Sequence, residues 1–159
     1  MKHSKKQIKR AVMIGVIGAA SAGPVALREA QKAGALIAEA GAVLVCGGLG
    51  GVMKAACKGA KSAGGITIGI LPGANASAAN EYVDFVILTA MNHARNVIIT
   101  NTAEAFIAID GSYGTLSEIA FALKYGKPVA GINTHEVKGV IKVKDAKTAV
   151  KTVMALIKK

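Results

Sequence analysis

Short apolar runs alternate with longer helical segments along this chain, and that alternation restricts the fold more than any other feature. The apolar runs, rich in Val, Ile and Ala, occupy residues 12–17, 42–46, 66–71, 85–88, 105–109 and 128–132. The helical segments occupy residues 24–40, 52–63, 92–101 and 114–125. Strands that alternate with helices form a parallel sheet with right-handed crossovers. We therefore predict one doubly wound, Rossmann-like α/β domain over residues 11–159, with a mainly parallel sheet of about six to seven strands.

The composition agrees with such a domain. Hydrophobic residues make up 52% of the chain, but aromatic residues make up only 4%. Small and β-branched side chains suit strands that are covered by helices on both faces. Pro24 and Gly41 fit the first turn and the end of the first helix. A short edge strand within 140–143 and a last helix with Asp145 as its N-cap complete the prediction.

The formal charge of +11 is concentrated at the two ends of the chain. Residues 1–10 carry five basic side chains, and residues 138–159 carry seven lysines against Asp145. Residues 11–137 carry eight basic and eight acidic side chains, so the body of the domain is neutral. Basic ends attract polyanions without sequence preference. The positive charge is explained equally well by a solvated tail over 1–10 and by the exposed face of a last helix. The scarcity of aromatic residues also argues against nucleic acid, and we expect no specific nucleic-acid partner.

The two cysteines, Cys46 and Cys57, do not predict a metal site. They lack CxxC spacing and an accompanying pair of histidines, so free thiols packed as small hydrophobic side chains are expected. No run reaches the roughly 18 apolar residues that a membrane helix needs, and the apolar run that follows the basic N-terminus contains Gly15 and Gly18, unlike a signal sequence. We expect a cytoplasmic protein without a membrane partner.

Three predicted strand ends carry turn residues, and two of these lead directly into a helix. Glycine lets a backbone approach a phosphate closely, and the free N–H groups of a helix start bind anions. Neither turn is a Walker A loop or a dinucleotide fingerprint, and tight packing also selects glycine. We call residues 47–51 the first glycine turn and residues 111–115 the second. The residues that we expect to contact a phosphate-bearing ligand are Gly18, Ala19, Ser21, Gly47, Gly48, Leu49, Gly50, Gly51, Asp110, Gly111, Ser112, Tyr113, Gly114 and Thr115.

Residues 46–73, 91–96 and 110–118 resemble the molybdenum-cofactor carrier branch of the LOG (Lonely Guy) Rossmann superfamily. That superfamily includes phosphoribohydrolases and proteins once labelled lysine decarboxylases, and its hallmark is P-G-G-x-G-T-x-x-E with an upstream arginine. The hallmark matches at Gly111, Gly114, Thr115 and Glu118. Asp110 replaces its proline and Ser112 replaces its second glycine.

The upstream arginine of the hallmark is matched by Arg95. It is followed by Asn96, where the hydrolases typically have lysine. This pair and the altered glycine motif resemble the carriers more than the hydrolases. The resemblance implies that the second glycine turn keeps its anion-binding end but has lost part of the hydrolase signature, while the first glycine turn resembles its family closely.

Arg95 and Glu118 are the catalytic candidates if the hydrolase alternative holds. Arg95 supplies a planar donor for a phosphate or for Glu118, and a surface salt bridge is the alternative. Glu118 suits ribose hydroxyls or an oxocarbenium-like centre, and an acid favoured by the helix dipole is the alternative. Asp110 is a candidate to orient Arg95. His93 is expected on a helix surface, and a position facing the pocket is the alternative.

We therefore expect a binder or carrier of a phosphate-bearing nucleotide-like or pterin-like ligand, in the manner of a molybdenum-cofactor carrier. It requires no other cofactor, and a bound nucleotide or molybdenum cofactor is expected. The alternative is a phosphoribohydrolase that cleaves the N-glycosidic bond of a nucleoside 5′-monophosphate. A homodimer or homotetramer is expected because relatives form them, and because the helix over 114–125 is apolar around much of its circumference.

Overall fold

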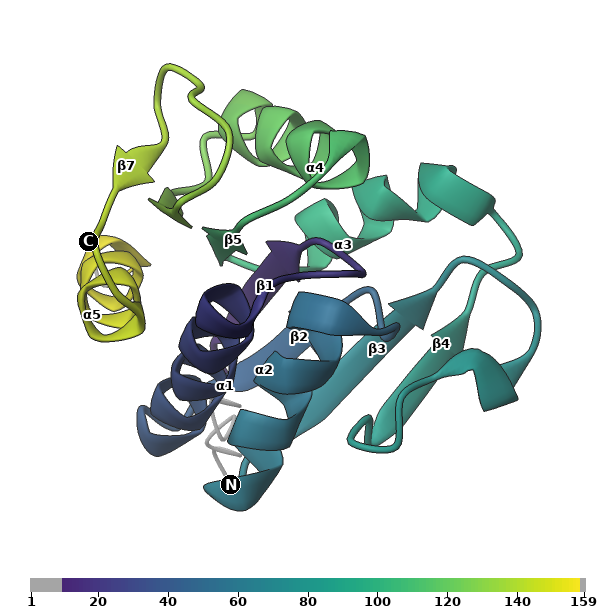
Figure 1. The fold of residues 1–159 in the computed structure, drawn as a ribbon. Helices are drawn as coiled ribbons and strands as arrows, with labels where there is room; N and C mark the ends of the chain where they lie inside the picture. Colours follow the sequence, from purple (N-terminus) through teal and green to yellow (C-terminus); the bar gives the residue numbers. More distant parts are fainter. Residues whose placement is uncertain (1–9, 158–159) are drawn as a thin grey trace, which may run out of the picture.

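The structure is a computed structural model that describes residues 10–157 (Figure 1). One seven-stranded sheet has the order β4-β3-β2-β1-β5-β6-β7, and every neighbouring pair is parallel. The single doubly wound α/β domain is therefore confirmed. The strands are β1 Met13–Gly18, β2 Val43–Cys46, β3 Thr67–Leu71, β4 Phe85–Leu88, β5 Ala105–Ile109, β6 Val129–Ile132 and β7 Ile141–Lys142.

Residues 10–157 form five α-helices and two short 3-10 helices, and all of them except the last α-helix lie between strands. The 3-10 helices are η1 Ala76–Ala78 and η2 Asn92–Arg95. No helix within residues 10–157 is long and apolar enough to cross a membrane. The α-helices are α1 Pro24–Glu39, α2 Gly51–Ser62, α3 Asn96–Thr102, α4 Tyr113–Lys124 and α5 Ala146–Ile157.

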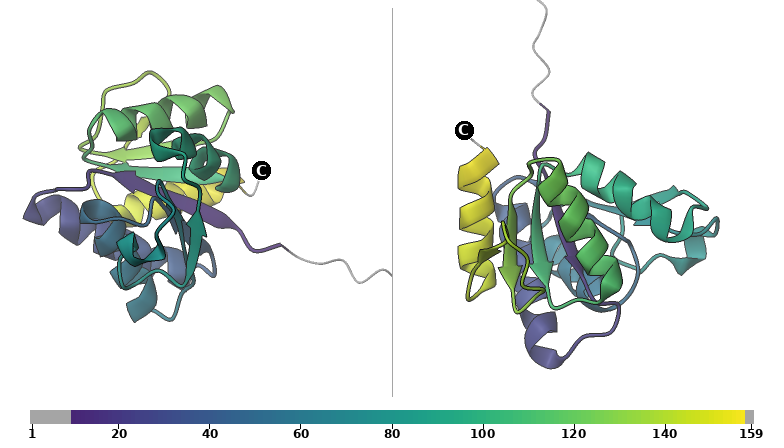
Figure 2. Two further views of the ribbon diagram at one scale, coloured as in Figure 1. Left: turned by 90° about the vertical axis from the view of Figure 1, so that its right-hand side faces the viewer. Right: turned by 90° about the horizontal axis from the view of Figure 1, so that it is seen from above.

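The helices form two layers, one on each side of the sheet. Helices α1, α2 and α5 cover one face, and α3 and α4 cover the other (Figure 2). Each layer closes its own apolar core against the central strands, which are buried on both faces as a parallel sheet requires. Phe106 is the largest fully buried side chain and packs on the α3 and α4 side.

Two glycines let α1 and α2 approach each other closely. A Cβ atom at Gly34 of α1 would lie 1.9 Å from the carbonyl oxygen of Ala56 in α2. A Cβ atom at Gly59 of α2 would lie 1.8 Å from the carbonyl oxygen of Gln31 in α1. No side chain fits at such distances, so these glycines fix the position of α2, whose first residues form one wall of the site described below.

Most predicted boundaries agree with the structure to within one or two residues. Asp145 caps α5 as predicted, because its Oδ1 accepts the N–H of Thr148 at 2.8 Å. The predicted helix over 92–101 is instead η2 followed by α3, and the fully buried side chains of α3 include Ile99. The predicted basic tail lies outside the described residues except for Arg10, which is exposed.

The strand order reverses between β1 and β5, and ligands of open parallel sheets bind at the carboxyl ends of strands beside such a point. β1 ends at Gly18 and β5 ends at Ile109. The second glycine turn follows β5 directly, and the first follows β2, the other neighbour of β1. The fold thus brings both glycine turns to the switch point.

Candidate functional site

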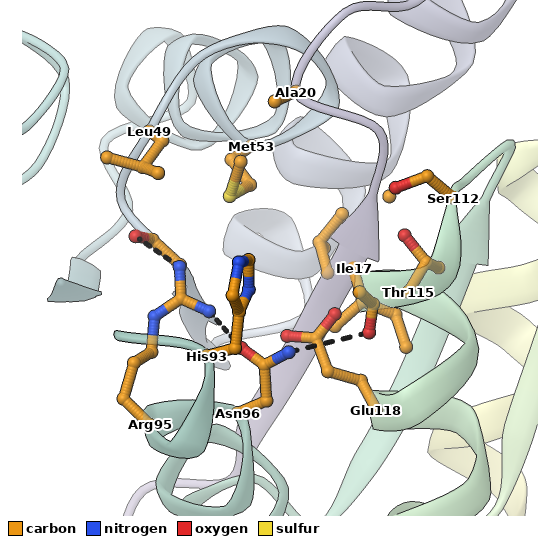
Figure 3. A pocket seen from close by; sticks show the side chains of 14 residues that line it. Ile17, Ala20, Leu49, Met53, His93, Arg95, Asn96, Ser112, Thr115 and Glu118 are labelled. Atoms are coloured by element: carbon orange, nitrogen blue, oxygen red, sulfur yellow. Dashed lines mark hydrogen bonds between the residues drawn. The ribbon is translucent and has the colours of Figure 1, made fainter. Parts of the chain in front are cut away.

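A cavity of about 130 Å³ lies at this switch point. Its walls come from the end of β1, the first glycine turn, the start of α2, η2 with the start of α3, and the first turns of α4 (Figure 3). Apolar side chains such as Ile17 and Met53 meet polar ones from η2, α3 and α4. The predicted charged residues Arg95 and Glu118 both line it.

Arg95 places a nearly buried guanidinium group in the wall. It is 7% exposed. Its Nη2 donates to the carbonyl oxygen of Gly47 at 3.3 Å, and its Nη1 donates to the side-chain oxygen of Asn96. Its Nε has no hydrogen-bond partner, and no salt bridge within residues 10–157 includes Arg95. Burial lowers the pKa of Arg95, and the charge of Glu118 opposes that effect.

Asn96 connects Arg95 to the start of α4. Its Oδ1 accepts from Arg95, and its Nδ2 donates to Ser117 Oγ at 3.1 Å and to the Gly114 carbonyl oxygen at 3.5 Å. The amide therefore fixes the distance between the guanidinium group and the second glycine turn. Lysine, with donors only, cannot accept from Arg95 in this way.

Glu118 lies one turn into α4 and is 7% exposed. Burial raises the pKa of Glu118 to about 7, although the charge of Arg95 acts to lower it. The two side chains make no salt bridge with each other. A carboxyl group with a pKa near neutrality exchanges a proton readily at physiological pH.

Hydrogen bonds hold the first glycine turn against its surroundings. The Gly48 N–H donates to Cys46 Sγ at 3.3 Å. The Val52 N–H, in the first turn of α2, donates to the Ala19 carbonyl oxygen at 3.0 Å. The Asn80 side chain donates to two further carbonyl groups of this turn. Part of the anion-binding capacity of the α2 start is thus used within the protein.

The glycines of the first turn are also required by packing. A Cβ atom at Gly51, which has a φ of +58°, would lie 2.2 Å from the Ala19 carbonyl oxygen. A Cβ atom at Gly47 would lie 2.6 Å from Nη2 of Arg95. Close contact with the rest of the protein therefore explains these two glycines without a ligand.

The second glycine turn leaves more of its polar groups free. The Gly111 N–H donates to Oδ1 of Asp110 at 2.8 Å. The N–H groups of Ser112, Gly114 and Thr115 have no partner among the described residues. Ser112 is the N-cap of α4, but its side chain makes no capping hydrogen bond. These N–H groups are free to bind an anion at the positive end of the helix dipole.

Two residues of the second turn differ in what surrounds them. A Cβ atom at Gly114 would meet nothing nearer than Nδ2 of Asn96 at 4.0 Å. Asp110 has a φ of +55°, a conformation that non-glycine residues rarely adopt. Gly114 therefore borders open space, whereas Asp110 uses its side chain to fix the turn.

The predicted ligand contacts divide into two groups. No hydrogen bond or salt bridge within residues 10–157 joins Asp110 to Arg95, and the Asp110 carboxylate accepts from the Gly111 N–H instead. Tyr113 is 88% exposed. The predicted residues that line the cavity are Gly18, Gly47, Leu49, Arg95, Ser112, Gly114, Thr115 and Glu118, and those that do not are Ala19, Ser21, Gly48, Gly50, Gly51, Asp110, Gly111 and Tyr113.

Six lining residues were not predicted. His93, expected on a helix surface, lines the cavity although it is exposed, and Asn96 was noticed only as a departure from the hydrolases. Their position next to Arg95 in the motif 91–96 was the available signal. Nothing in the sequence singled out the other residues, which are Val16, Ile17, Ala20 and Met53.

Comparison with known proteins identifies relatives of this chain. A protein of uncharacterised function from Archaeoglobus fulgidus is 52% identical over 121 residues, which cover 76% of this chain and 80% of that protein. The molybdenum cofactor binding protein of the phototrophic bacterium Rippkaea orientalis matches with a TM-score of 0.88 and 36% identity, over 93% of this chain and 98% of that one. The molybdenum cofactor carrier protein of Chlamydomonas reinhardtii matches with a TM-score of 0.86 and 35% identity, over 94% and 100% of the two chains.

These matches confirm the resemblance to the carrier branch, because they extend over nearly the whole domain rather than over the glycine turns alone. A family model described as the SLOG cluster4 family matches residues 11–157. The chain therefore belongs to the SLOG cluster4 family.

Proposed function

We propose that this protein binds a phosphate-bearing, nucleotide-like or pterin-like compound and acts as a carrier of the molybdenum cofactor. The observation that carries the proposal is Arg95, a buried cation that forms no salt bridge within residues 10–157 and lines the same cavity as the start of α4, where N–H groups are free. A buried charge without a counter-ion is unfavourable, and a phosphate supplies that counter-ion. Two solved relatives, described as a binder and as a carrier of this cofactor, support the same conclusion.

The start of α5 shows why the start of α4 suits a ligand. The first N–H groups of α5 are occupied, since Glu29 accepts from Ala146 and Asp145 accepts from Thr148. The start of α4 has no such side chain. Carboxylates of the protein thus fill the anion site of one helix, and we expect the phosphate of the ligand to fill the other.

The cavity suits one end of the ligand. Its volume of about 130 Å³ is below the roughly 300–1,000 Å³ of pockets that enclose a whole small ligand. We expect part of a flat ring system to lie between Ile17 and Met53, with the remainder extending out of the cavity. Arg95 and Glu118 then face the ring or the atoms that join it to the phosphate.

Retention of the cofactor tests the proposal. The purified protein is incubated with molybdenum cofactor without oxygen and passed through a gel-filtration column, and the molybdenum that remains with it is counted by mass spectrometry. We expect Arg95→Gln to retain at least about tenfold less, because it loses a charge-assisted contact. Arg28→Gln, which removes an exposed arginine on α1, is the matched control and retains as much as the wild type. Equal retention by the wild type and Arg95→Gln would reject the proposal.

Glu118 favours one alternative function. A carboxyl group with a pKa of about 7 can donate a proton to a leaving base. The alternative reaction is hydrolysis of a nucleoside 5′-monophosphate to the free base and ribose 5-phosphate. Incubation with AMP and chromatography for adenine tests it. Turnover that disappears in Glu118→Ala would establish the hydrolase and exclude a protein that only carries its ligand.

A further inference from the structure

One edge of the sheet presents apolar side chains that nothing in the described part of the chain covers. All four residues of β4 (Phe85–Leu88) are exposed, from 36% at Val86 to 60% at Phe85. Successive side chains of a strand point to opposite faces of the sheet, so β4 is uncovered on both faces. Ile66, just before β3, and Met91, just after β4, are also exposed. Figure 1 shows β4 at the outer edge of the sheet, away from the labelled helices.

The backbone of β4 is also incompletely paired. β4 pairs with β3 on one side, and no strand within residues 10–157 pairs with it on the other. An edge strand with free N–H and C=O groups and apolar side chains is a template for pairing with another chain. Such an edge is either covered in the functional protein or leads to aggregation.

The opposite edge of the sheet is protected in the usual ways. β7 has only two residues, Ile141 and Lys142. Lys142 forms an ion pair with Glu136, and Lys138 and Lys144 flank the strand. Short length and lysines are devices that prevent edge-to-edge association. Residues 85–92, in contrast, contain no ionisable side chain.

We propose that β4 is the interface between two copies of this chain, which pair their β4 strands antiparallel across a two-fold axis. In an interface with two-fold symmetry, both copies contribute the same surface patch. Because residues 85–92 carry no charge, the β4 segments of two copies meet without electrostatic repulsion. Antiparallel pairing also gives the free N–H and C=O groups of each β4 a partner. This proposal does not depend on the ligand.

Helix α4, which we expected from its sequence to lie in an interface between subunits, is a weaker candidate for that interface than β4. In α4, Ile119 is buried, and Leu116, Phe121 and Leu123 are partly buried within the monomer. The ring of Phe121 stacks on Tyr125, with ring centres 6.3 Å apart. Most apolar residues of α4 are therefore covered by their own chain, whereas those of β4 are not.

Sedimentation velocity of the full chain at micromolar concentration tests the interface. We expect the wild type to sediment as a dimer or a larger assembly built from it. Ile87→Lys places a charge at the centre of β4 and is expected to weaken association about 100-fold or more. Ile141→Lys, at the other edge, is the matched control and leaves association unchanged. Circular dichroism checks folding, and Ile87→Thr, which keeps strand propensity but is polar, replaces Ile87→Lys if the latter is unfolded.

Three results would overturn the proposal. The first is a wild type that remains a monomer throughout this range, which would leave β4 for a different partner. The second is a folded Ile87 variant that associates as tightly as the wild type, which would locate the interface elsewhere. The third is an equal loss of association in Ile141→Lys, which would indicate a general effect of added charge.

Discussion

Both glycine turns have glycine at their first and fourth positions, but packing requires more of the glycines in the first turn than in the second. In the first glycine turn, Gly47 and Gly51 leave room for Arg95 and for the backbone at Ala19. In the second, Gly114 borders open space beside the cavity. A glycine that the packing does not require is the better indicator of a ligand. The first turn is therefore a support for Arg95 and α2, and the second has the polar groups that are still free to bind.

The expectation from sequence favoured the first turn, because it resembles its family closely. That expectation did not take hydrogen bonds from distant segments into account. Asn80 occupies two carbonyl groups of the first turn, Ala19 occupies the N–H of Val52 directly after it, and neither Ala19 nor Asn80 is close to the turn in sequence. Four variants separate the roles of the two turns, and they follow in order of the size of the expected effect.

Gly51→Ala should damage folding more than any other change at the two turns. The new Cβ atom meets the Ala19 carbonyl oxygen, and the positive φ is strained for alanine. We expect the free energy of unfolding to fall by about 3 kcal/mol or more, measured by urea denaturation. Gly50→Ala is the matched control, since its Cβ atom makes only ordinary contact at 3.4 Å, and it should lose less than about 1 kcal/mol. Equal effects of the two changes would refute the packing role of Gly51.

Glu118→Gln should remove a dependence of stability on pH that originates beside the second turn. The folded-state pKa is about 7 against an ordinary value of 4.5. Between these values the folded chain holds a proton that the unfolded chain has released, so the contribution to stability is greatest below pH 4.5 and is lost as the pH rises through 7. At pH 8 we expect Glu118→Gln to be more stable than the wild type by about 1–3 kcal/mol.

Urea denaturation of both proteins at pH 5 and pH 8 measures this difference. The wild type should lose stability between the two pH values relative to the variant. A wild type and variant with parallel pH profiles would show that the Glu118 carboxyl group is not perturbed by burial.

Gly114→Ala should have the opposite pattern to Gly51→Ala. The added methyl group meets no protein atom closely, and alanine is a better helix residue than glycine, so the stability should change by less than about 1 kcal/mol. The methyl group enters the space beside the cavity, and molybdenum retention should fall about tenfold, equivalent to about 1.4 kcal/mol. Unchanged retention in this variant would remove the second turn from the binding site.

Asp110→Asn should have the smallest effect. It removes a negative charge next to the start of α4, where that charge competes with a bound phosphate. Asparagine tolerates a positive φ as well as aspartate does, so the stability should stay within about 0.5 kcal/mol. We expect the affinity for the ligand to rise about two- to fivefold, equivalent to roughly 0.3–1 kcal/mol. Competition binding against the wild type measures it, and weaker binding would mean that Asp110 itself contacts the ligand.

The sequence by itself determined the fold, because strand and helix signals are local. The apolar runs predicted β4 and β5 with the boundaries that the structure has. The position of Asp145 before the last helix predicted the capping hydrogen bond that it makes. Family resemblance, carried by short motifs, identified Arg95 and Glu118 as candidates for one site, and both line the same cavity. Each of these inferences needs only neighbouring residues or a known spacing.

Only the tertiary structure decided which polar groups remain free and which side chains are covered. Asn96 bridges Arg95 to α4, Val52 uses its N–H on Ala19, and burial shifts the pKa of Glu118. The exposure of β4 likewise depends on tertiary structure. Within residues 10–157, β4 has a neighbouring strand on one side only, and the helices cover the central strands but not β4. Hydrogen-bond partners and burial are set by residues far apart in the chain, so no local pattern contains them. The two glycine turns therefore differ in their packing and in their free polar groups for reasons that become visible only when the distant segments are brought together.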